Sequence, residues 1–244
     1  MGYPMAGWLS KCGYAVVVYN RTQAVSQRWL SDYSGESADT VAAAVAGAEI
    51  VFSCLGNDDD VRAVVAGEAG ALAAMNPGSI LVDHTTTSAL LARELAEQAN
   101  ALDIGFVDAP VSGGQQGAEN GQLTVMCGGQ QSHFDTASKA IQSYAKSLKL
   151  MGDVGSGQLC KMVNQICIAG VVQGLAEGLN FAKRAGLDAQ QVVEVISKGA
   201  AQSWQMENRY QTMLANEYEH GFAVQWMRKD LAFALDEAKA NGSD

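Results

Sequence analysis

The sequence predicts an α/β fold in which a doubly wound parallel sheet over residues 1–153 is followed by an all-α domain over residues 154–244. Two observations lead to this prediction. In the first part, apolar runs of strand length alternate with alanine-rich segments of helical length. After about Gly155 no further strand-like run occurs, and the segments have helical spacing.

The predicted strands are apolar throughout rather than alternating. They cover residues 15–19, 50–55, 79–83, 105–109 and 123–127. Segments such as "ADTVAAAVAGA" and "TSALLARELAEQANAL" separate them and read as helices. Continuously apolar strands that alternate with helices are typical of a parallel sheet covered on both faces.

The second part begins with a long segment, "GQLCKMVNQICIAGVVQGLAEGLNFAKRAGL", that is apolar on most of its faces. This pattern predicts a helix buried between layers. Residues 188–200 and 227–240 continue with helical spacing. The change of pattern places the domain boundary near Asp153.

Composition narrows the class of protein. The chain has 244 residues, 48% of them hydrophobic, and a formal net charge of -10. This charge repels nucleic acid and anionic lipid, so we expect neither as a partner. The apolar runs are shorter than the roughly 20 residues that span a bilayer, which favours a cytoplasmic protein. The five cysteines contain no CxxC, and four lie in apolar segments, which predicts reduced core thiols without disulfides.

A metal site is not expected. The three histidines, His84, His133 and His220, form no HExxH motif and are not paired with cysteine or carboxylate at ligand spacing. The acidic segment "GNDDDV" could indicate magnesium. A charged first turn of a helix, stabilised by the helix dipole, is the favoured interpretation.

The opening stretch "MGYPMAGWLSKCGYAVVVYNRT" has the register of a dinucleotide-binding loop. Gly2 would be the third glycine of GxGxxG, and the next strand ends at Asn20 and Arg21, where the ribose-reading residue belongs. An arginine there accommodates the 2′-phosphate of NADP, and Asn20 and Thr22 could add hydrogen bonds to it. A helix cap or turn at Gly2 remains the alternative.

Six segments occur in an order that resembles the β-hydroxyacid dehydrogenases: "MGYPMAGWL", "VYNRT", "DHTTTS", "DAPVSGGQQGAENGQLTVMCGG", "GSGQLCKMVNQ" and "MRKDLAFAL". This family includes 3-hydroxyisobutyrate dehydrogenase and 2-hydroxy-3-oxopropionate (tartronate semialdehyde) reductase. The resemblance implies a Rossmann-type domain and hydride transfer between NAD(P) and a short β-hydroxy acid or its semialdehyde. NADP(H) is favoured and NAD(H) is possible.

The resemblance also assigns residues. Lys161 would be catalytic, and Asn164, one turn further along the same predicted helix, would hold the substrate. Ser112, Gly113 and Gly114 would bind the substrate carboxylate, which a hydroxyl and backbone N–H groups can do. The cofactor set comprises Met1, Gly2, Asn20, Arg21, Thr22, Leu55, Thr86 and Lys229.

Each assignment has a plainer alternative. Lys161 could reach solvent, "PVSGG" could be an ordinary turn, a threonine of "DHTTTS" could cap a helix, and Lys229 with Asp230 could be a solvated surface pair. For Lys161 the chemistry agrees with the resemblance, because an ammonium stabilises the charge that hydride transfer builds on oxygen.

The resemblance further predicts that both ends are truncated. Family members begin with an apolar strand and a GLGxMG loop, of which this chain has Met1 and Gly2, and they continue with helices beyond Asp244. We therefore also consider a non-catalytic remnant or binding module. An imine reductase usually lacks the lysine seen at position 161, and a phosphogluconate-type enzyme would require an arginine cluster that we do not find. The family predicts a homo-dimer or homo-tetramer.

Overall fold

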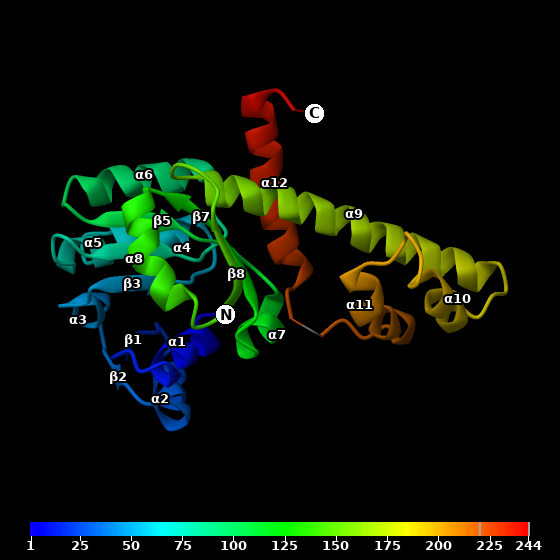
Figure 1. Ribbon diagram of the computed structural model, residues 1–244, viewed down its shortest axis with the longest axis horizontal. Helices are drawn as coiled ribbons and strands as arrows, with labels where there is room; N and C mark the ends of the chain where they lie inside the picture. Colours follow the sequence, from blue (N-terminus) through cyan, green and yellow to red (C-terminus); the bar gives the residue numbers. More distant parts are fainter. Residues whose placement is uncertain (220, 244) are drawn as a thin grey trace. The chain divides into compact units, whose positions relative to one another are not determined.

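The computed structural model describes residues 1–219 and 221–243, and its chain divides into two compact units, residues 1–161 and 162–244. The first unit contains all the described strands (Figure 1). These are β1 (Val17–Val18), β2 (Glu36–Ser37), β3 (Ile50–Ser53), β4 (Ile80–Asp83), β5 (Gly105–Asp108), β6 (Val111–Ser112), β7 (Leu123–Gly129) and β8 (Ala145–Leu150).

In the chain, one helix of the first unit precedes β1 and the others listed here lie between strands. They are α1 (Gly2–Lys11), α2 (Gln23–Asp32), α3 (Val41–Val45), α4 (Asp58–Val61), the π-helical turn η1 (Arg62–Ala66), α5 (Ala71–Ala74), α6 (Ala89–Asn100), α7 (Gly114–Glu119) and α8 (Gln131–Ile141). The alternation of strands and helices confirms the predicted doubly wound domain.

The strands form two sheets. β1 and β2 pair in parallel next to α1 and α2, while the larger sheet has the order β3-β4-β5-β7-β6, with β8 beside β7 (Figure 1). In this larger sheet β3, β4 and β5 are parallel, but β7 runs antiparallel to both β5 and β6. The sheet is therefore mixed where we expected it to be parallel. No strand of the described residues pairs with both β1 and β3.

Strand β4 shows why continuously apolar runs predicted the sheet. Ile80 and Val82 face a core built with α1 and α8, whereas Leu81 faces a second core built with α4, α5 and α6. All three side chains are buried. A strand covered on both faces must be apolar at every position, so its sequence loses the alternation of a half-exposed strand.

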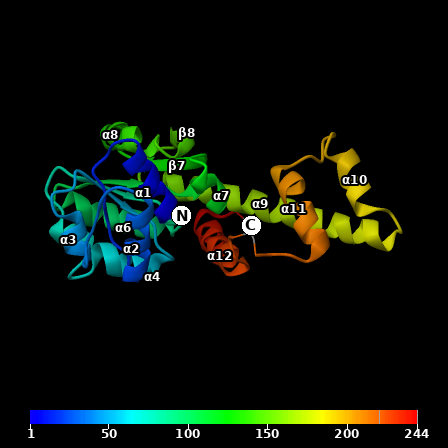
Figure 2. The same cartoon turned by 90° about the horizontal axis from the view of Figure 1, so that it is seen from below.

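The second unit is helical, as predicted. The long helix α9 (Ser156–Arg184) runs from the first unit into the second, and is followed by α10 (Ala189–Ile196), α11 (Trp204–Ala215) and α12 (Val224–Asn241). The far end of α9 packs with α10 and α11 around Leu175, Leu179 and Val193, and Figure 2 shows these three helices side by side. Helix α11 was not predicted.

Helix α9 corrects one expectation. We predicted a helix buried between layers, yet many of its apolar side chains are exposed, including Val163, Ile166, Val171, Val172 and Phe181. Its most apolar window has a mean hydropathy of 1.4, and by length and composition it could cross a membrane. A single such helix is weak evidence, because core helices of other proteins pass the same test.

The cysteines correct another expectation. All five are free, but only Cys127 is buried; Cys54 and Cys160 are half-buried, and Cys12 and Cys167 are exposed. Core burial, predicted from the apolar sequence around the cysteines, is therefore correct only for Cys127. Burial raises the pKa of Cys127 to about 12, so that thiol stays protonated.

Candidate active site

The carboxyl ends of three parallel strands bring Ser53, Asp83 and Asp108 into one row. Strand register pairs Ser53 with Asp83 and Asp83 with Asp108. Ser53 Oγ donates to Asp83 Oδ1 at 2.8 Å, and the same oxygen accepts from the Thr85 N–H at 3.0 Å. Burial raises the pKa of Asp83 to about 6, against the opposing effect of these hydrogen bonds. Ligands of open α/β sheets bind at this edge.

Thr85 connects two loops at the sheet edge. Its Oγ1 accepts a hydrogen bond from the Leu55 N–H at 2.9 Å. The loop after β3, which contains Leu55, is therefore fixed to the loop after β4, which contains Thr86. Two predicted cofactor residues are thus held on adjacent loops.

The buried His84 directly follows β4 at this edge of the sheet. His84 Nδ1 lies 2.6 Å from the Ala109 carbonyl oxygen, and His84 Nε2 lies 2.7 Å from the Tyr144 hydroxyl. Because a carbonyl can only accept, Nδ1 carries the proton and Nε2 accepts from Tyr144. Burial lowers the pKa of His84 to about 4. The ring is therefore neutral at physiological pH.

The beginning of α9 is anchored by a buried carboxylate. Asp108 Oδ1 accepts from the Gly155 N–H at 2.8 Å, and Oδ2 accepts from the Gln158 N–H at 2.9 Å. Burial raises the pKa of Asp108, and these N–H groups oppose that shift. A negative charge at a helix N-terminus also interacts favourably with the helix dipole.

The Gln158 side chain continues this connection. Its Nε2 donates to the Thr85 carbonyl oxygen at 2.8 Å, and its Oε1 accepts from the Thr87 N–H at 3.1 Å. Helix α9 is thus hydrogen-bonded to the loop after β4 through side-chain and backbone atoms.

Lys161 lies one turn after Gln158 on α9, and only 6% of its surface is exposed. The alternative of a solvent-reaching Lys161 therefore does not hold. An ammonium group so buried requires a polar environment. The first unit ends at this residue.

Ser112 ends β6, which pairs with β7 through Ser112 and Thr124. The next two residues, Gly113 and Gly114, have φ values of +130° and +63°. Residues other than glycine rarely adopt such positive φ values, so the turn requires glycine at both positions. The turn follows β5 closely, and β5 supplies Asp108, so the predicted carboxylate-binding segment and the anchor of α9 belong to one stretch of chain.

In the second unit, a buried carboxylate organises α9 and α12. Gln165 Nε2 donates to Asp230 Oδ2 at 2.7 Å, and Asn164 Nδ2 donates to Gln165 Oε1 at 2.8 Å. Lys229 Nζ lies 3.3 Å from Asp230 Oδ1. Asp230 is 2% exposed, so the alternative of a solvated surface pair with Lys229 is wrong. Asn164 and Lys229, both predicted site residues, belong to this one network.

The predicted nucleotide residues near the N-terminus form two groups. Helix α1 begins at Gly2 after Met1, and a Cβ at Gly2 would lie 3.4 Å from that of Cys54, next to Leu55. At the end of β1, Asn20 Oδ1 accepts from the Thr22 N–H at 2.9 Å, and Arg21 is exposed between them. The unpaired N–H groups of a helix start suit a pyrophosphate.

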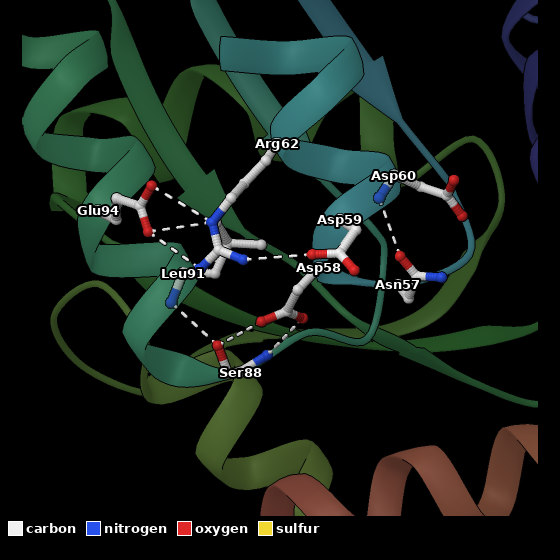
Figure 3. Close-up of polar contacts among 8 residues, drawn as sticks. All are labelled: Asn57, Asp58, Asp59, Asp60, Arg62, Ser88, Leu91 and Glu94. Carbon is white, nitrogen blue, oxygen red and sulfur yellow. Dashed lines mark hydrogen bonds and ion pairs between the residues drawn. The ribbon is translucent and has the colours of Figure 1, made fainter. Parts of the chain in front are cut away.

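The acidic segment after β3 forms the first turn of α4, as predicted (Figure 3). Asn57 caps this helix, Asp58 accepts from the Ser88 hydroxyl at 2.6 Å, and Asp59 lies 3.8 Å from Arg62. Among residues 1–219 and 221–243, no group of three His, Cys, Asp or Glu side chains could hold a metal ion. His220 and Asp244 lie outside the described residues.

Two family models match the chain. The first, described as the NAD-binding domain of 6-phosphogluconate dehydrogenase, covers residues 1–153; the second, described as the NAD-binding domain of NADP-dependent 3-hydroxyisobutyrate dehydrogenase, covers residues 155–244. The chain belongs to the β-hydroxyacid dehydrogenase family.

Individual relatives agree with this membership. An uncharacterized oxidoreductase of Shewanella frigidimarina is 63% identical over 100% of this chain and 84% of its own length. The 2-hydroxy-3-oxopropionate reductase of Escherichia coli is 32% identical over 98% of this chain and 82% of its own. A crystal structure of 3-hydroxyisobutyrate dehydrogenase from Salmonella typhimurium has a TM-score of 0.89 and 28% identity, over 100% of this chain and 85% of that one.

As a member of this family, the chain carries NAD(P)-binding domains, and its homologues include dehydrogenases that act on small hydroxy acids. The predicted truncation of its two ends stays a prediction. Four residues that organise these hydrogen bonds were not predicted as site residues from the sequence: Asp108, Gln158, Gln165 and Asp230. All four lie inside motifs that carry the resemblance, and a carboxylate after the apolar run "GFV" is a signal for a buried polar role at Asp108.

Proposed function

We propose that the protein transfers a hydride between NAD(P) and a short β-hydroxy acid or its semialdehyde, of the 3-hydroxyisobutyrate or 2-hydroxy-3-oxopropionate type. One observation carries the proposal: the buried Lys161 stands on a helix whose start is fixed by Asp108, close in the chain to the Ser112–Gly114 turn. The names of the relatives support the substrate class.

Lys161 has the chemistry for the proton step. When bound, the nicotinamide supplies or accepts the hydride. In reduction, the Lys161 ammonium would stabilise the growing charge on the carbonyl oxygen and then protonate it. In oxidation, neutral Lys161 would accept the hydroxyl proton.

Substrate orientation falls to four residues. The Ser112 hydroxyl and the backbone of Gly113 and Gly114 would bind the carboxylate, and Asn164 would hold the substrate hydroxyl or carbonyl side. The positive φ values of both glycines support close backbone approach to a small acid. Ser112→Ala should raise the KM for the acid more than it lowers kcat, because this contact exists in ground and transition states alike.

For the cofactor we favour NADP(H) over NAD(H). Arg21 is exposed at the end of β1, where it can meet a 2′-phosphate, and Asn20 and Thr22 flank it. Met1 and Gly2 would meet the pyrophosphate, Leu55 and Thr86 would line the bound dinucleotide, and Lys229 would lie toward the nicotinamide. Arg21→Ala should weaken NADPH binding and leave NADH binding nearly unchanged in a fluorescence titration; equal weakening of both would contradict the preference.

We also propose a homo-dimer or homo-tetramer in the cytoplasm, with a domain boundary near Asp153. Exposed apolar side chains along α9, with Phe181 at 71% exposure, support assembly because such side chains are stabilised by a covering surface. Five free cysteines support a reducing compartment.

The decisive experiment is steady-state kinetics with NADPH and tartronate semialdehyde, and with NADP⁺ and 3-hydroxyisobutyrate. Lys161→Ala should bind NADPH normally yet lose turnover by roughly 10² to 10⁴-fold, the range for a positioned general acid. Lys161→Arg should not restore it, since guanidinium does not give up its proton. Lys183→Ala, an exposed lysine on the same helix, is the matched control. Cofactor binding without turnover in the unmodified protein would indicate a binding module instead.

A further inference from the structure

We infer that Gln158 is a positioning residue that fixes Lys161 relative to the cofactor-binding loop after β4. The inference deepens the proposed function and rests on it. It concerns the distance between two parts of one site rather than a contact with substrate or cofactor.

Both polar atoms of the Gln158 side-chain amide are hydrogen-bonded to the loop after β4. Nε2 donates to the Thr85 carbonyl oxygen at 2.8 Å, and Oε1 accepts from the Thr87 N–H at 3.1 Å. The residue is 1% exposed, so water does not compete for these bonds. The loop segment between the two contacts contains Thr86. A single side chain thus holds the backbone on both sides of a proposed cofactor residue.

The backbone of Gln158 is fixed from another direction. Its N–H donates to Asp108 Oδ2 at 2.9 Å. The neighbouring Gly157 allows close packing, because a Cβ there would lie 2.4 Å from the Met126 carbonyl oxygen and 2.8 Å from that of Asp108. The start of α9 therefore rests directly on backbone atoms of the sheet. It has little freedom to shift along its axis.

Because both residues lie in the same helix, fixing the position of Gln158 also fixes the position of Lys161. Residues three apart in a helix lie on the same side, so Gln158 stands one turn below Lys161. On the other side, Thr85 Oγ1 accepts from the Leu55 N–H at 2.9 Å. Hydrogen bonds thus connect both proposed cofactor loops to the turn that precedes Lys161.

No other side chain of this size meets both contacts. Methionine has the length but neither donor nor acceptor, so it would leave the Thr87 N–H and the Thr85 carbonyl without partners. Glutamate would keep the acceptor for Thr87 but place a second acceptor against the Thr85 carbonyl. Breaking the connection would let the loop and the helix move independently. A displacement of about 1 Å between reacting groups can lower a rate by about 10²-fold.

The test compares the unmodified protein with Gln158→Met and with the control Gln131→Met. Gln131 also lies in the first unit and donates to Asp135 at 2.7 Å, but it is exposed. With NADPH carrying deuterium at the transferred position, Gln158→Met should lower kcat by roughly 10 to 100-fold. The isotope effect on kcat should rise, because hydride transfer becomes rate-limiting, while the Kd for NADPH changes little.

These readouts separate positioning from simple destabilisation. A variant that only unfolds more has fewer active molecules, which lowers the apparent kcat but leaves the isotope effect unchanged. Loss of turnover at a constant isotope effect would therefore overturn the inference, as would normal kinetics. If Gln158→Met does not fold, Gln158→Glu breaks only the Thr85 contact and should change the isotope effect in the same direction.

Hydrogen exchange gives a second measurement that requires no turnover. Gln158→Met should speed amide exchange in peptides covering residues 85–88 and 156–161, with other strands of the first unit unchanged. If the unmodified protein turns over neither substrate, the proposed function fails and exchange alone decides this inference. Unchanged exchange in residues 85–88 would then overturn it.

Discussion

Three of residues 156–161 of α9 are buried and the other three are half-buried, and Gln158 is hydrogen-bonded to Asp108 and to the loop after β4. Beyond them, much of the same helix carries apolar side chains in solvent. The contrast is clearest at its glycines. A Cβ at Gly157 would collide with backbone atoms, but a Cβ at Gly170, Gly174 or Gly178 would meet nothing within 4 Å. The same residue type in one helix thus serves close packing at one end and an open face along the rest.

Two aspartates that cap helix starts also differ in burial. Asp108 holds the beginning of α9 from inside the first unit, and Asp188 caps α10 in the second by accepting from the N–H groups of Gln190 and Gln191 at 2.9 and 3.2 Å. Both carboxylates accept two backbone hydrogen bonds. Only Asp108 is buried. The comparison isolates the effect of burial on one kind of interaction.

The largest expected effect comes from removing each cap. Asp108→Ala leaves two buried N–H groups without partners and should lower the free energy of unfolding by roughly 4 kcal/mol. Asp188→Ala leaves the N–H groups of Gln190 and Gln191 to water and should lower the free energy of unfolding by about 1 kcal/mol. Urea denaturation at neutral pH measures both. Equal losses of unfolding free energy would mean that burial does not distinguish the cap of α9 from the cap of α10. Asp108→Asn should cost less than Asp108→Ala, because it keeps an acceptor.

Alanine at the glycines of α9 comes next. Gly157→Ala should destabilise by about 3 kcal/mol, since its Cβ would lie 2.4 Å from the Met126 carbonyl oxygen. Gly174→Ala should instead stabilise by up to about 1 kcal/mol, because alanine is the better helix former and the position is open. Thermal and chemical denaturation would show opposite signs. The same sign for both would contradict the contrast along α9.

The buried network of the first unit should also respond to pH. His84 has a folded pKa of about 4, below its unfolded value of 6.5, so its contribution to stability is lost as pH falls through that interval. His84→Gln removes this dependence. Its stability deficit relative to the unmodified protein should shrink by up to about 3 kcal/mol between about pH 7 and pH 4.

Asp83 provides the control of opposite sign. Its folded pKa of about 6 lies above the ordinary 3.8, so its contribution is present below pH 3.8 and lost as pH rises to about 6. Asp83→Asn should therefore gain stability relative to the unmodified protein over that rise. Denaturation curves at a series of pH values measure both slopes, and parallel slopes for the two variants would contradict the assignment.

The smallest effect on folding is expected on the open face of α9. Phe181 is 71% exposed, so Phe181→Ser should change the stability of the single chain by no more than about 0.5 kcal/mol. If this face assembles with another copy, the same change should lower the oligomer fraction in analytical ultracentrifugation. An unchanged oligomer would place the interface elsewhere.

The sequence by itself determined the strands of the sheet core and the helical second part. β3, β4, β5 and β7 lie within or over the predicted apolar runs, because strands covered on both faces must be apolar throughout. β8, "AKSLKL", was missed because it is partly exposed and polar at three of its six positions, and β2 and β6 because they have only two residues each. The antiparallel pairing of β7 depends on chain direction, which hydrophobicity does not encode.

The sequence also predicts which residues form the site, including Lys161 and the Ser112–Gly114 turn, because they lie in local motifs that resemble those of the family. Only the tertiary structure decided their partners. Asp108 meets Gln158 across 50 residues of chain, and Gln165 meets Asp230 across 65. Hydrogen bonds between buried polar groups depend on positions that packing brings together, and no local pattern specifies them. For the same reason the sequence could not show that α9 is held tightly at its start and open along most of its length.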